Sequence, residues 1–251
     1  MAADVTGAII ARDGEYHLPA CLASLAWTDA RLVLLDAATR DRSAQIAGEH
    51  GARVVTRPFV NFSMQRNAAL DLVETPWVLF VDTDERATPA LAEEVRAAIG
   101  NGRADAPTGY WIPRRNYIWG GWIRHGGWWP DHQLRLLRVA DARYEETRDV
   151  HEFATMRGTT DRLVEPMLHY NYDRLDQFLT KQRHYTRLEA QRLQRLGVRA
   201  RPHNFLLQPA REFRRRFLQL EGHRDGWRGF ALASLLAWYT AVTYADLARF
   251  S

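Results

Sequence analysis

Three carboxylates stand within four residues at the end of an apolar run. Asp82, Asp84 and Glu85 follow residues 77–81 almost directly, and like charges this close are costly unless a cation or hydrogen-bond donors neutralise them. A divalent ion would do so, because Mg²⁺ in proteins is usually shared between one or two carboxylates and a substrate phosphate. The alternative is a surface loop whose acids cap the next helix. We favour the cation site, because the acids follow a strand of an alternating α/β pattern.

Two further acids follow earlier apolar runs, and a helix before the acid triplet carries an arginine. Asp13 comes shortly after residues 5–11, and Asp36 ends the run at 32–35. Arg66 lies early in its helix and would pair with the acids or with a phosphate, the alternative being a solvated position. The absence of G-x-G-x-x-G and G-x-x-x-x-G-K-[ST] argues against a dinucleotide-binding fold and a P-loop.

Tryptophan and glycine are concentrated in the second half. Four of the nine tryptophans lie close together among four glycines: Trp119, Trp122, Trp128 and Trp129. Aromatic rings on a flexible backbone suit stacking against sugar faces, and the indole N–H adds a donor. Two alternatives are a loop anchored in the core by these rings and a platform for single-stranded nucleic acid.

Apolar runs alternate with helical patterns through the first hundred residues. The runs lie at residues 5–11, 32–35, 53–56 and 77–81, and helical patterns start at 18, 41, 63 and 88. This alternation predicts an α/β fold, a doubly wound and mostly parallel sheet flanked by helices. Ligands of such sheets bind beyond the carboxyl ends of the strands, where Asp13, Asp36 and Asp82 fall. Further strands are expected at 109–115 and 134–138.

The composition is that of an ordinary globular protein. The 251 residues are 46% hydrophobic and 25% charged, which excludes disordered, collagen-like and disulfide-rich classes. The single cysteine, Cys21, excludes an internal disulfide and a multi-cysteine metal site. A net charge of +4 weakly favours anionic partners. The first residues lack a basic and apolar leader pattern, so we expect a cytoplasmic protein.

The motifs together resemble the family 2 glycosyltransferases, which have the GT-A fold. The likeness rests on residues 9–15, 21–25, 35–43, 65–70 and 80–85. A closer likeness to the lipopolysaccharide inner-core β-glucosyltransferase branch rests on Arg115-Asn116, 120–138, 150–152, His169-Tyr170 and 225–229. The resemblance implies a GT-A domain over 1–170, with a nucleotide-sugar half at 1–100 and an acceptor half at 101–170. A helical extension follows at 171–251.

The resemblance also implies an inverting transfer of a hexose from a UDP-sugar, with Mg²⁺ or Mn²⁺ as the metal. The donor would be bound by Ala11, Asp13, Glu15, Asp36, Arg66 and Asp82. Asp84 would hold the metal with Asp82, and His151 is a further metal candidate unless it is a hydrogen-bonded loop histidine. Two positions depart from the family pattern: Asp13 replaces the usual asparagine, and Ala38 replaces a glycine. Both bear on donor preference.

An inverting glycosyltransferase needs one base to take the proton of the acceptor hydroxyl. Asp131 is the first candidate and Glu152 the second, although Pro130-Asp131 is also typical of a turn. The acceptor, a saccharide or lipid-linked sugar, would contact Trp128, Trp129, His132, Gln133 and Arg135. Arg135 and Arg138 would neutralise phosphate or else lie on a solvated strand face.

The last third of the chain has a helical pattern. An apolar stripe begins at Leu175, Pro202 interrupts it, and a basic run at 211–217 precedes the aromatic-rich stretch 227–250. The apolar part of that stretch falls short of the roughly 20 residues that span a bilayer. We expect a peripheral contact through 211–250 with the inner face of the cytoplasmic membrane. The alternative is packing on the catalytic domain or on a second copy.

Two rival functions also fit parts of this sequence. A non-catalytic module that holds glycan or nucleic acid would explain the tryptophans and the basic surface, and steep salt dependence would mark nucleic-acid binding. A nucleotidyltransferase also uses acids on an α/β sheet, but it releases pyrophosphate. The glycosyltransferase interpretation, which involves no nucleic-acid partner, accounts for more of the motifs.

Overall fold

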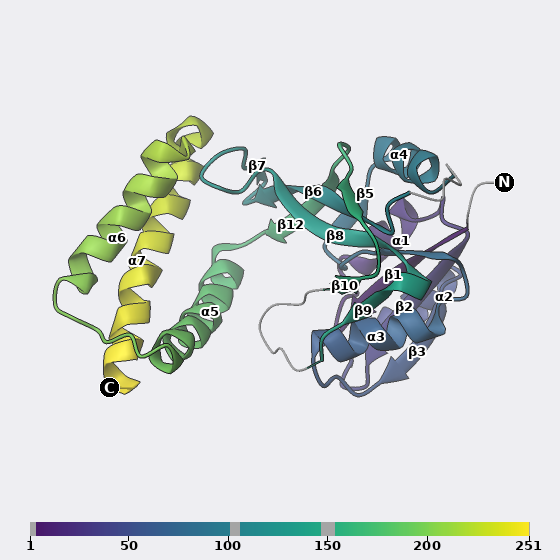
Figure 1. Ribbon diagram of the computed structural model, residues 1–251, viewed down its shortest axis with the longest axis horizontal. Helices are drawn as coiled ribbons and strands as arrows, with labels where there is room; N and C mark the ends of the chain where they lie inside the picture. Colours follow the sequence, from purple (N-terminus) through teal and green to yellow (C-terminus); the bar gives the residue numbers. More distant parts are fainter. Residues whose placement is uncertain (1–3, 101–105, 147–153, 251) are drawn as a thin grey trace. The chain divides into compact units, whose positions relative to one another are not determined.

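The computed structural model describes residues 4–100, 106–146 and 154–250 (Figure 1). The chain forms two compact units: residues 1–114 with 132–169, and residues 115–131 with 170–251. The segment 115–131, which the sequence analysis assigned to the acceptor half of the catalytic domain, therefore groups with the C-terminal helices.

The sheet is built around four parallel strands. It runs in the order β3-β2-β1-β4-β8-β6-β12-β5, and β1 pairs in parallel with both β2 and β4. Its strands are β1 (Val5–Ala11), β2 (Ala30–Asp36), β3 (Arg53–Arg57), β4 (Trp77–Phe80), β5 (Glu85–Ala87), β6 (Gly109–Ile118), β8 (Asp131–Arg138) and β12 (Met167–Tyr172). Two short strands complete it: β7 (Gly121–Trp122) and β11 (Thr160–Arg162) pair with β6. A separate two-stranded sheet is formed by β9 (Ala142–Tyr144) and β10 (Ala154–Met156). The mostly parallel α/β sheet predicted from the alternating pattern is confirmed.

Helices cover both faces of the sheet because the strands are apolar on both sides. One core joins the sheet to α1 (Leu18–Ser24), α2 (Ser43–Glu49) and α4 (Pro89–Gly100). A second core joins the other face to α3 (Phe62–Leu72). The predicted start of α4 is confirmed, since the Thr88 hydroxyl accepts a hydrogen bond from the Leu91 N–H at 3.1 Å.

The second unit has its own apolar core of Ile118, Ile123, Tyr172, Phe178 and Leu232. Its helices are α5 (Leu175–Arg195), α6 (Asn204–Arg214), the π turn η2 (Arg215–Gln219), the 3₁₀ turn η3 (Gly222–Asp225) and α7 (Gly226–Phe250). Pro202 lies in the break between α5 and α6, as predicted.

Helix α7 is longer than the apolar stretch predicted from sequence. The prediction that the apolar stretch is too short to span a bilayer is wrong by length and composition, because the helical segment Gly222–Phe250 is long and apolar enough to cross one, and 33% of its apolar window is buried. A helix that packs inside a protein passes the same test. Asp246 lies in α7, is buried, and accepts hydrogen bonds from Arg183 of α5 at 2.8 and 3.2 Å.

Turn η3 ties the tryptophan-rich loop to α7. The Asp225 carboxylate accepts hydrogen bonds from the backbone N–H groups of Arg124 (3.2 Å) and His125 (2.8 Å) and contacts Nδ1 of His125 at 3.1 Å. A Cβ at Gly229 would lie 1.8 Å from the Gly222 carbonyl oxygen, so only glycine permits this close approach. The sequence 225–229 therefore has a packing role in this unit.

Candidate functional site

The loops after β1 and β2 bring three predicted donor-binding residues together. Asp36 is buried at the end of β2 and accepts backbone N–H bonds from Ala38 (3.0 Å) and Phe59 (3.3 Å). Asp13 accepts the N–H of Arg40 at 2.8 Å, and Glu15 accepts the N–H of Arg42 at 3.2 Å. These carboxylates thus hold the second loop against the first. Ala11 is buried where β1 ends.

The two departures from the family pattern fit this backbone. Asp13 has a φ of 47°, in the left-handed region that Asn and Asp tolerate better than most residues. Ala38 is not among the described non-glycine residues with positive φ. The glycine usual at that position is therefore not required for the backbone conformation of this loop.

Asp82 lies at the end of β4, where two buried arginines bind it. Arg66 of α3 donates to Oδ1 at 3.3 Å, and Arg135 of β8 donates to Oδ1 at 3.2 Å and also to Oδ2. Burial alone would raise the pKa of Asp82, but the guanidinium groups of Arg135 and Arg66 outweigh it and hold the pKa well below its usual range. Asp82 is therefore ionised. Arg66 pairs with the acids, one of the two roles expected for it.

Glu85 is fully buried and completes this ion network. Its Oε1 accepts hydrogen bonds from Arg135 and Arg114, both at 3.1 Å, and its Oε2 accepts the backbone N–H of Asp82 at 2.9 Å. Arg135 is itself buried, so its side chain holds the acid loop and does not lie on a solvated strand face. Burial lowers the pKa of Arg135, but Asp82 and Glu85 raise it above its ordinary value.

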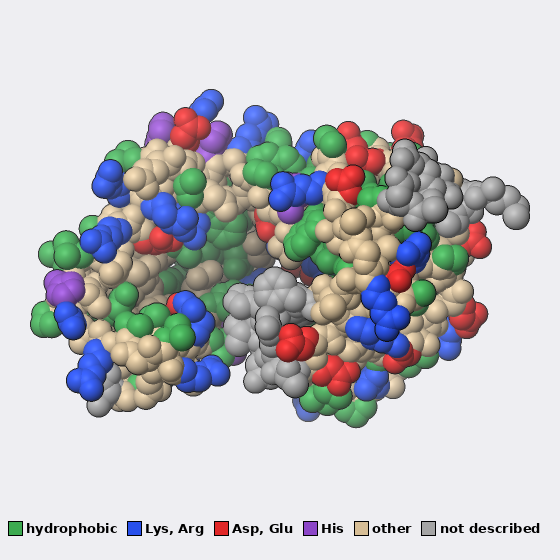
Figure 2. Space-filling view, viewed as in Figure 1, with side chains coloured by type: hydrophobic (Ala, Val, Ile, Leu, Met, Phe, Trp, Pro, Cys, Tyr) green, Lys and Arg blue, Asp and Glu red, His purple; other side chains and the backbone are tan. Residues whose placement is uncertain are grey.

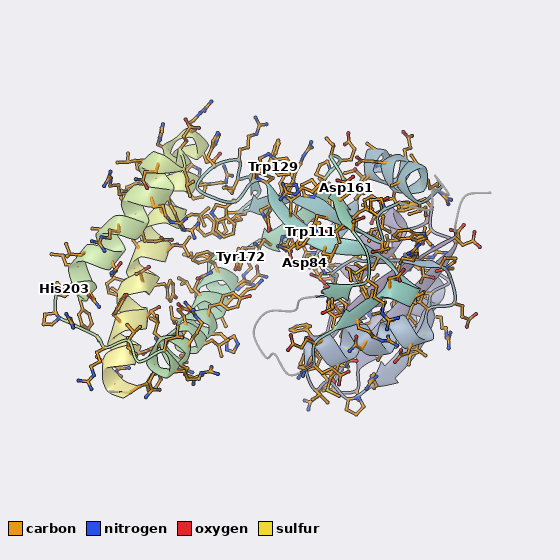
Figure 3. The ribbon with its side chains drawn as sticks, viewed as in Figure 1. Asp84, Trp111, Trp129, Asp161, Tyr172 and His203 are labelled. Carbon is orange, nitrogen blue, oxygen red and sulfur yellow. The ribbon has the colours of Figure 1, made fainter. Side chains whose placement is uncertain are left out.

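Asp84, labelled in Figure 3, lies between these two acids in the chain and contacts a residue of β12. Its Oδ2 is 3.5 Å from Nε2 of His169, because β12 pairs antiparallel with β5 and sets His169 opposite Glu85. His169 is buried. The sequence offered no signal for this pair, because the two residues are far apart in the chain.

The predicted base lies in the second unit. Oδ2 of Asp131 accepts a hydrogen bond from the buried Asn116 amide at 3.3 Å, and the same amide donates to the Trp128 carbonyl at 2.9 Å. Asn116 therefore couples Asp131 to the tryptophan-rich loop.

The four clustered tryptophans divide into different roles. Trp119 stacks on Trp227 at a centroid distance of 5.8 Å, and Trp128 packs against the core of the unit. Trp122 has the guanidinium carbons of Arg115 and Arg124 over its ring at 4.7 and 4.2 Å and meets the edge of Trp129. Core anchoring, the alternative to sugar stacking, thus applies to Trp119 and Trp128.

Comparison with known proteins identifies the class of this site. The model of glycosyl transferase family 2 matches residues 8–168, well over half of the chain. The chain belongs to glycosyltransferase family 2. It is 27% identical over 253 residues to the lipopolysaccharide core biosynthesis glycosyltransferase LpsC of Rhizobium meliloti, covering 95% of this chain and 90% of LpsC.

Solved structures agree on the fold. The structure of residues 1–349 of TarS from S. aureus superposes with a TM-score of 0.52 at 14% identity, over 97% of this chain and 91% of TarS. The same protein in complex with UDP gives a TM-score of 0.50 at 16% identity, over 98% of this chain and 89% of that one. The GT-A architecture and the glycosyltransferase class expected from the motifs are confirmed.

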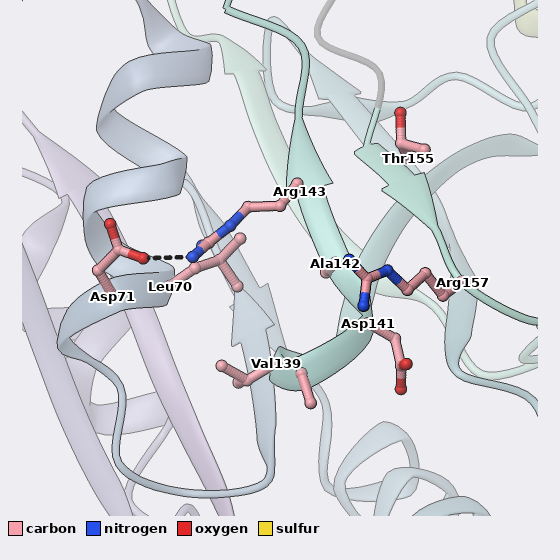
Figure 4. Close-up of a pocket in the computed structure, with 9 residues that line it drawn as sticks. Leu70, Asp71, Val139, Asp141, Ala142, Arg143, Thr155 and Arg157 are labelled. Atoms are coloured by element: carbon pink, nitrogen blue, oxygen red, sulfur yellow. Dashed lines mark hydrogen bonds and ion pairs between the residues drawn. The ribbon is translucent and has the colours of Figure 1, made fainter.

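The remaining predicted site residues have mixed outcomes. His132 and Gln133 are half-buried on β8, and their acceptor contact stays a prediction. His151 and Glu152, predicted as metal ligand and second base, lie outside the described residues. A cavity of about 590 Å³ in the first unit is lined by none of the predicted site residues but by Asp71, Arg143 and their neighbours (Figure 4).

The acids fit a metal shared with a donor and do not form a closed metal cage. Among the described residues no cluster of three or more His, Cys, Asp or Glu side chains could hold an ion. Asp82 is bound by two arginines, and Oδ2 of Asp84 lies 3.5 Å from Nε2 of His169. Such partial sets are typical of ions that take their other ligands from phosphates and water.

Proposed function

We propose that this family 2 glycosyltransferase transfers a hexose, with inversion, from a UDP-sugar to a saccharide or lipid-linked acceptor. The observation that carries the proposal is the group of acids at the carboxyl ends of β1, β2 and β4, of which Asp82 is kept ionised by arginine. A nucleotide binds at this edge in α/β sheets. Likeness to LpsC favours an acceptor in lipopolysaccharide core synthesis.

In this mechanism Asp36 and Asp13 line the pocket of the base and ribose, and Asp82 faces the ribose. Asp84, with His169 beside it, would hold Mg²⁺ or Mn²⁺. A bound divalent ion supplies positive charge that stabilises the departing diphosphate. The first unit would bind the donor.

Asp131 would take the proton from the acceptor hydroxyl as the sugar is transferred. The hydrogen bond that Asn116 donates to Oδ2 orients the carboxylate. Trp129 lies near this base in the chain and would contact the acceptor sugar. The enzyme would work in the cytoplasm, on the inner face of the membrane.

Calorimetric titration of UDP tests the donor site. We expect binding that requires Mn²⁺, is lost in EDTA, and is weakened at least tenfold in Asp84→Ala. The matched control is Asp71→Ala, which removes an exposed acid beside the cavity of Figure 4. Equal UDP affinity of Asp84→Ala and the wild type would overturn the role of Asp84, and absence of UDP binding would overturn the donor.

A further inference from the structure

A stretch of the second unit carries only positive charge. Residues 190–211 contain five arginines and His203 but no aspartate or glutamate. Arg192 pairs with Glu189 at 2.7 Å. Arg195, Arg199 and Arg201 have no ion pair with any residue that the structure describes. Their charges are therefore available to an external anion.

The same stretch exposes large apolar side chains. They are Leu196, Val198, Phe205, Leu206 and Leu207, with Leu206 at 75% and Leu196 at 64% exposure. Figure 2 shows hydrophobic and basic side chains next to each other at this end of the unit, around the position that Figure 3 labels His203. Five such side chains within twelve residues form a patch, and apolar patches of this kind typically mark interaction sites.

The patch occupies one end of the helical unit. It includes the last turn of α5, the connection to α6 and the first turn of α6. The C-terminal end of α7 lies beside it, since the Gln194 side-chain amide donates to the Phe250 carbonyl at 2.8 Å. We call residues 195–207 the basic apolar tip. A tip at the end of a bundle can meet a flat surface without disturbing the helix packing.

We propose that the basic apolar tip docks on a lipid bilayer that contains anionic lipids. Leucine and phenylalanine side chains enter the boundary between headgroups and acyl chains, and arginines bind the phosphates above them. The combination of arginines and apolar side chains fits a bilayer surface, where phosphates lie above acyl chains. A partner bound by charge alone would gain nothing from exposed leucines. The tip lies just before the segment 211–250 in which the sequence predicted a membrane contact. This inference does not depend on sugar transfer.

The docking is peripheral. If α7 crossed the membrane instead, Asp246 would lose its buried pair with Arg183 of α5, and an unpaired carboxylate inside a bilayer is costly. The tip therefore holds the protein on the surface while α7 stays packed in its unit.

Vesicle sedimentation of the full chain without donor tests the proposal. We expect binding to vesicles of phosphatidylcholine with 30% phosphatidylglycerol, at least tenfold weaker binding to pure phosphatidylcholine, and weakening by salt. Arg201→Gln/Leu206→Glu should reduce partitioning at least tenfold. Arg162→Gln/Val164→Glu, two exposed positions of the first unit with the same change in net charge, should bind like the wild type.

Several results would overturn the proposal. They are equal binding of the tip variant and the wild type, no binding to anionic vesicles, and retention of the chain on vesicles after alkaline carbonate, which would indicate insertion. A dimer that the tip variant dissociates, without vesicle binding, would assign the tip to a second copy. Tip-dependent binding to tRNA alone would assign it to nucleic acid. Circular dichroism checks that the tip variant folds. UDP titration of the same variant shows whether its donor site is intact, so that a loss of vesicle binding can be assigned to the tip.

Discussion

The ion network under the acid loop predicts a specific loss of stability in Arg135→Met. Arg135 bridges Asp82 and the fully buried Glu85. Breaking a buried ion pair from one side costs about 3–5 kcal/mol. The Asp82 side chain is 37% exposed, so water weakens the Arg135–Asp82 pair. Losing this pair should cost no more than losing a surface pair, about 0–1 kcal/mol. Because Arg114 still binds Glu85, we expect the low end of the range, about 3 kcal/mol.

Urea unfolding followed by circular dichroism measures this loss. The control is Arg143→Met, whose pair with Asp71 is exposed on both sides and whose loss should cost below about 1 kcal/mol. The pKa of Asp82 is lowered in the folded state, so its contribution is present above the unfolded pKa of about 3.9 and is lost as pH falls below it. The difference between wild type and Arg135→Met should therefore shrink from pH 5 towards pH 2. Wild-type stability of the variant, or a difference that grows with acid, would refute the reasoning.

Three further outcomes are expected. Gly229→Ala should lose about 1–3 kcal/mol of stability or more, because its Cβ meets the Gly222 carbonyl. The control Gly48→Ala has open space around the new Cβ in helix α2 and should gain about 0.5–1 kcal/mol. Thermal unfolding of both variants measures the difference. Asp131→Asn should lower kcat by about 10²–10⁴-fold with unchanged UDP affinity, and full activity would exclude it as the base. His169→Ala should raise the Mn²⁺ concentration that half-maximal UDP binding requires, and an unchanged Mn²⁺ requirement would exclude His169 from the metal site.

Much of the first unit could be predicted from sequence because buried parallel strands are continuous apolar runs. The run at residues 5–11 is β1 in full, and Thr88-Pro89 begins α4 where the cap and the proline indicate. The three-residue strands β5 and β11 carry too few residues for a periodic signal. The grouping of 115–131 with the C-terminal helices depends on long-range packing, such as the bonds of Asp225 to this loop.

The candidate site was predictable in its acids and in Arg66, but not in the partners that come from distant strands. Asp13, Asp36 and Asp82 follow strands, and the topology of the sheet brings their strand ends to one edge. The partners Arg135 and His169 reach the acids through strands β8 and β12, about 50 and 85 positions further along the chain. Strand register decides such pairs, and a single sequence carries no direct record of register.

The arginines that bind the acid triplet change the role expected of the metal. Three like charges predict a divalent ion that neutralises them, but Arg66, Arg114 and Arg135 already bind Asp82 and Glu85. The fold therefore does not need a metal, and the ion would enter with the diphosphate that supplies its remaining ligands. It follows that EDTA should leave the melting temperature unchanged in the absence of nucleotide. Mn²⁺ and UDP together should raise the melting temperature more than the sum of their separate effects, because only the pair completes the site.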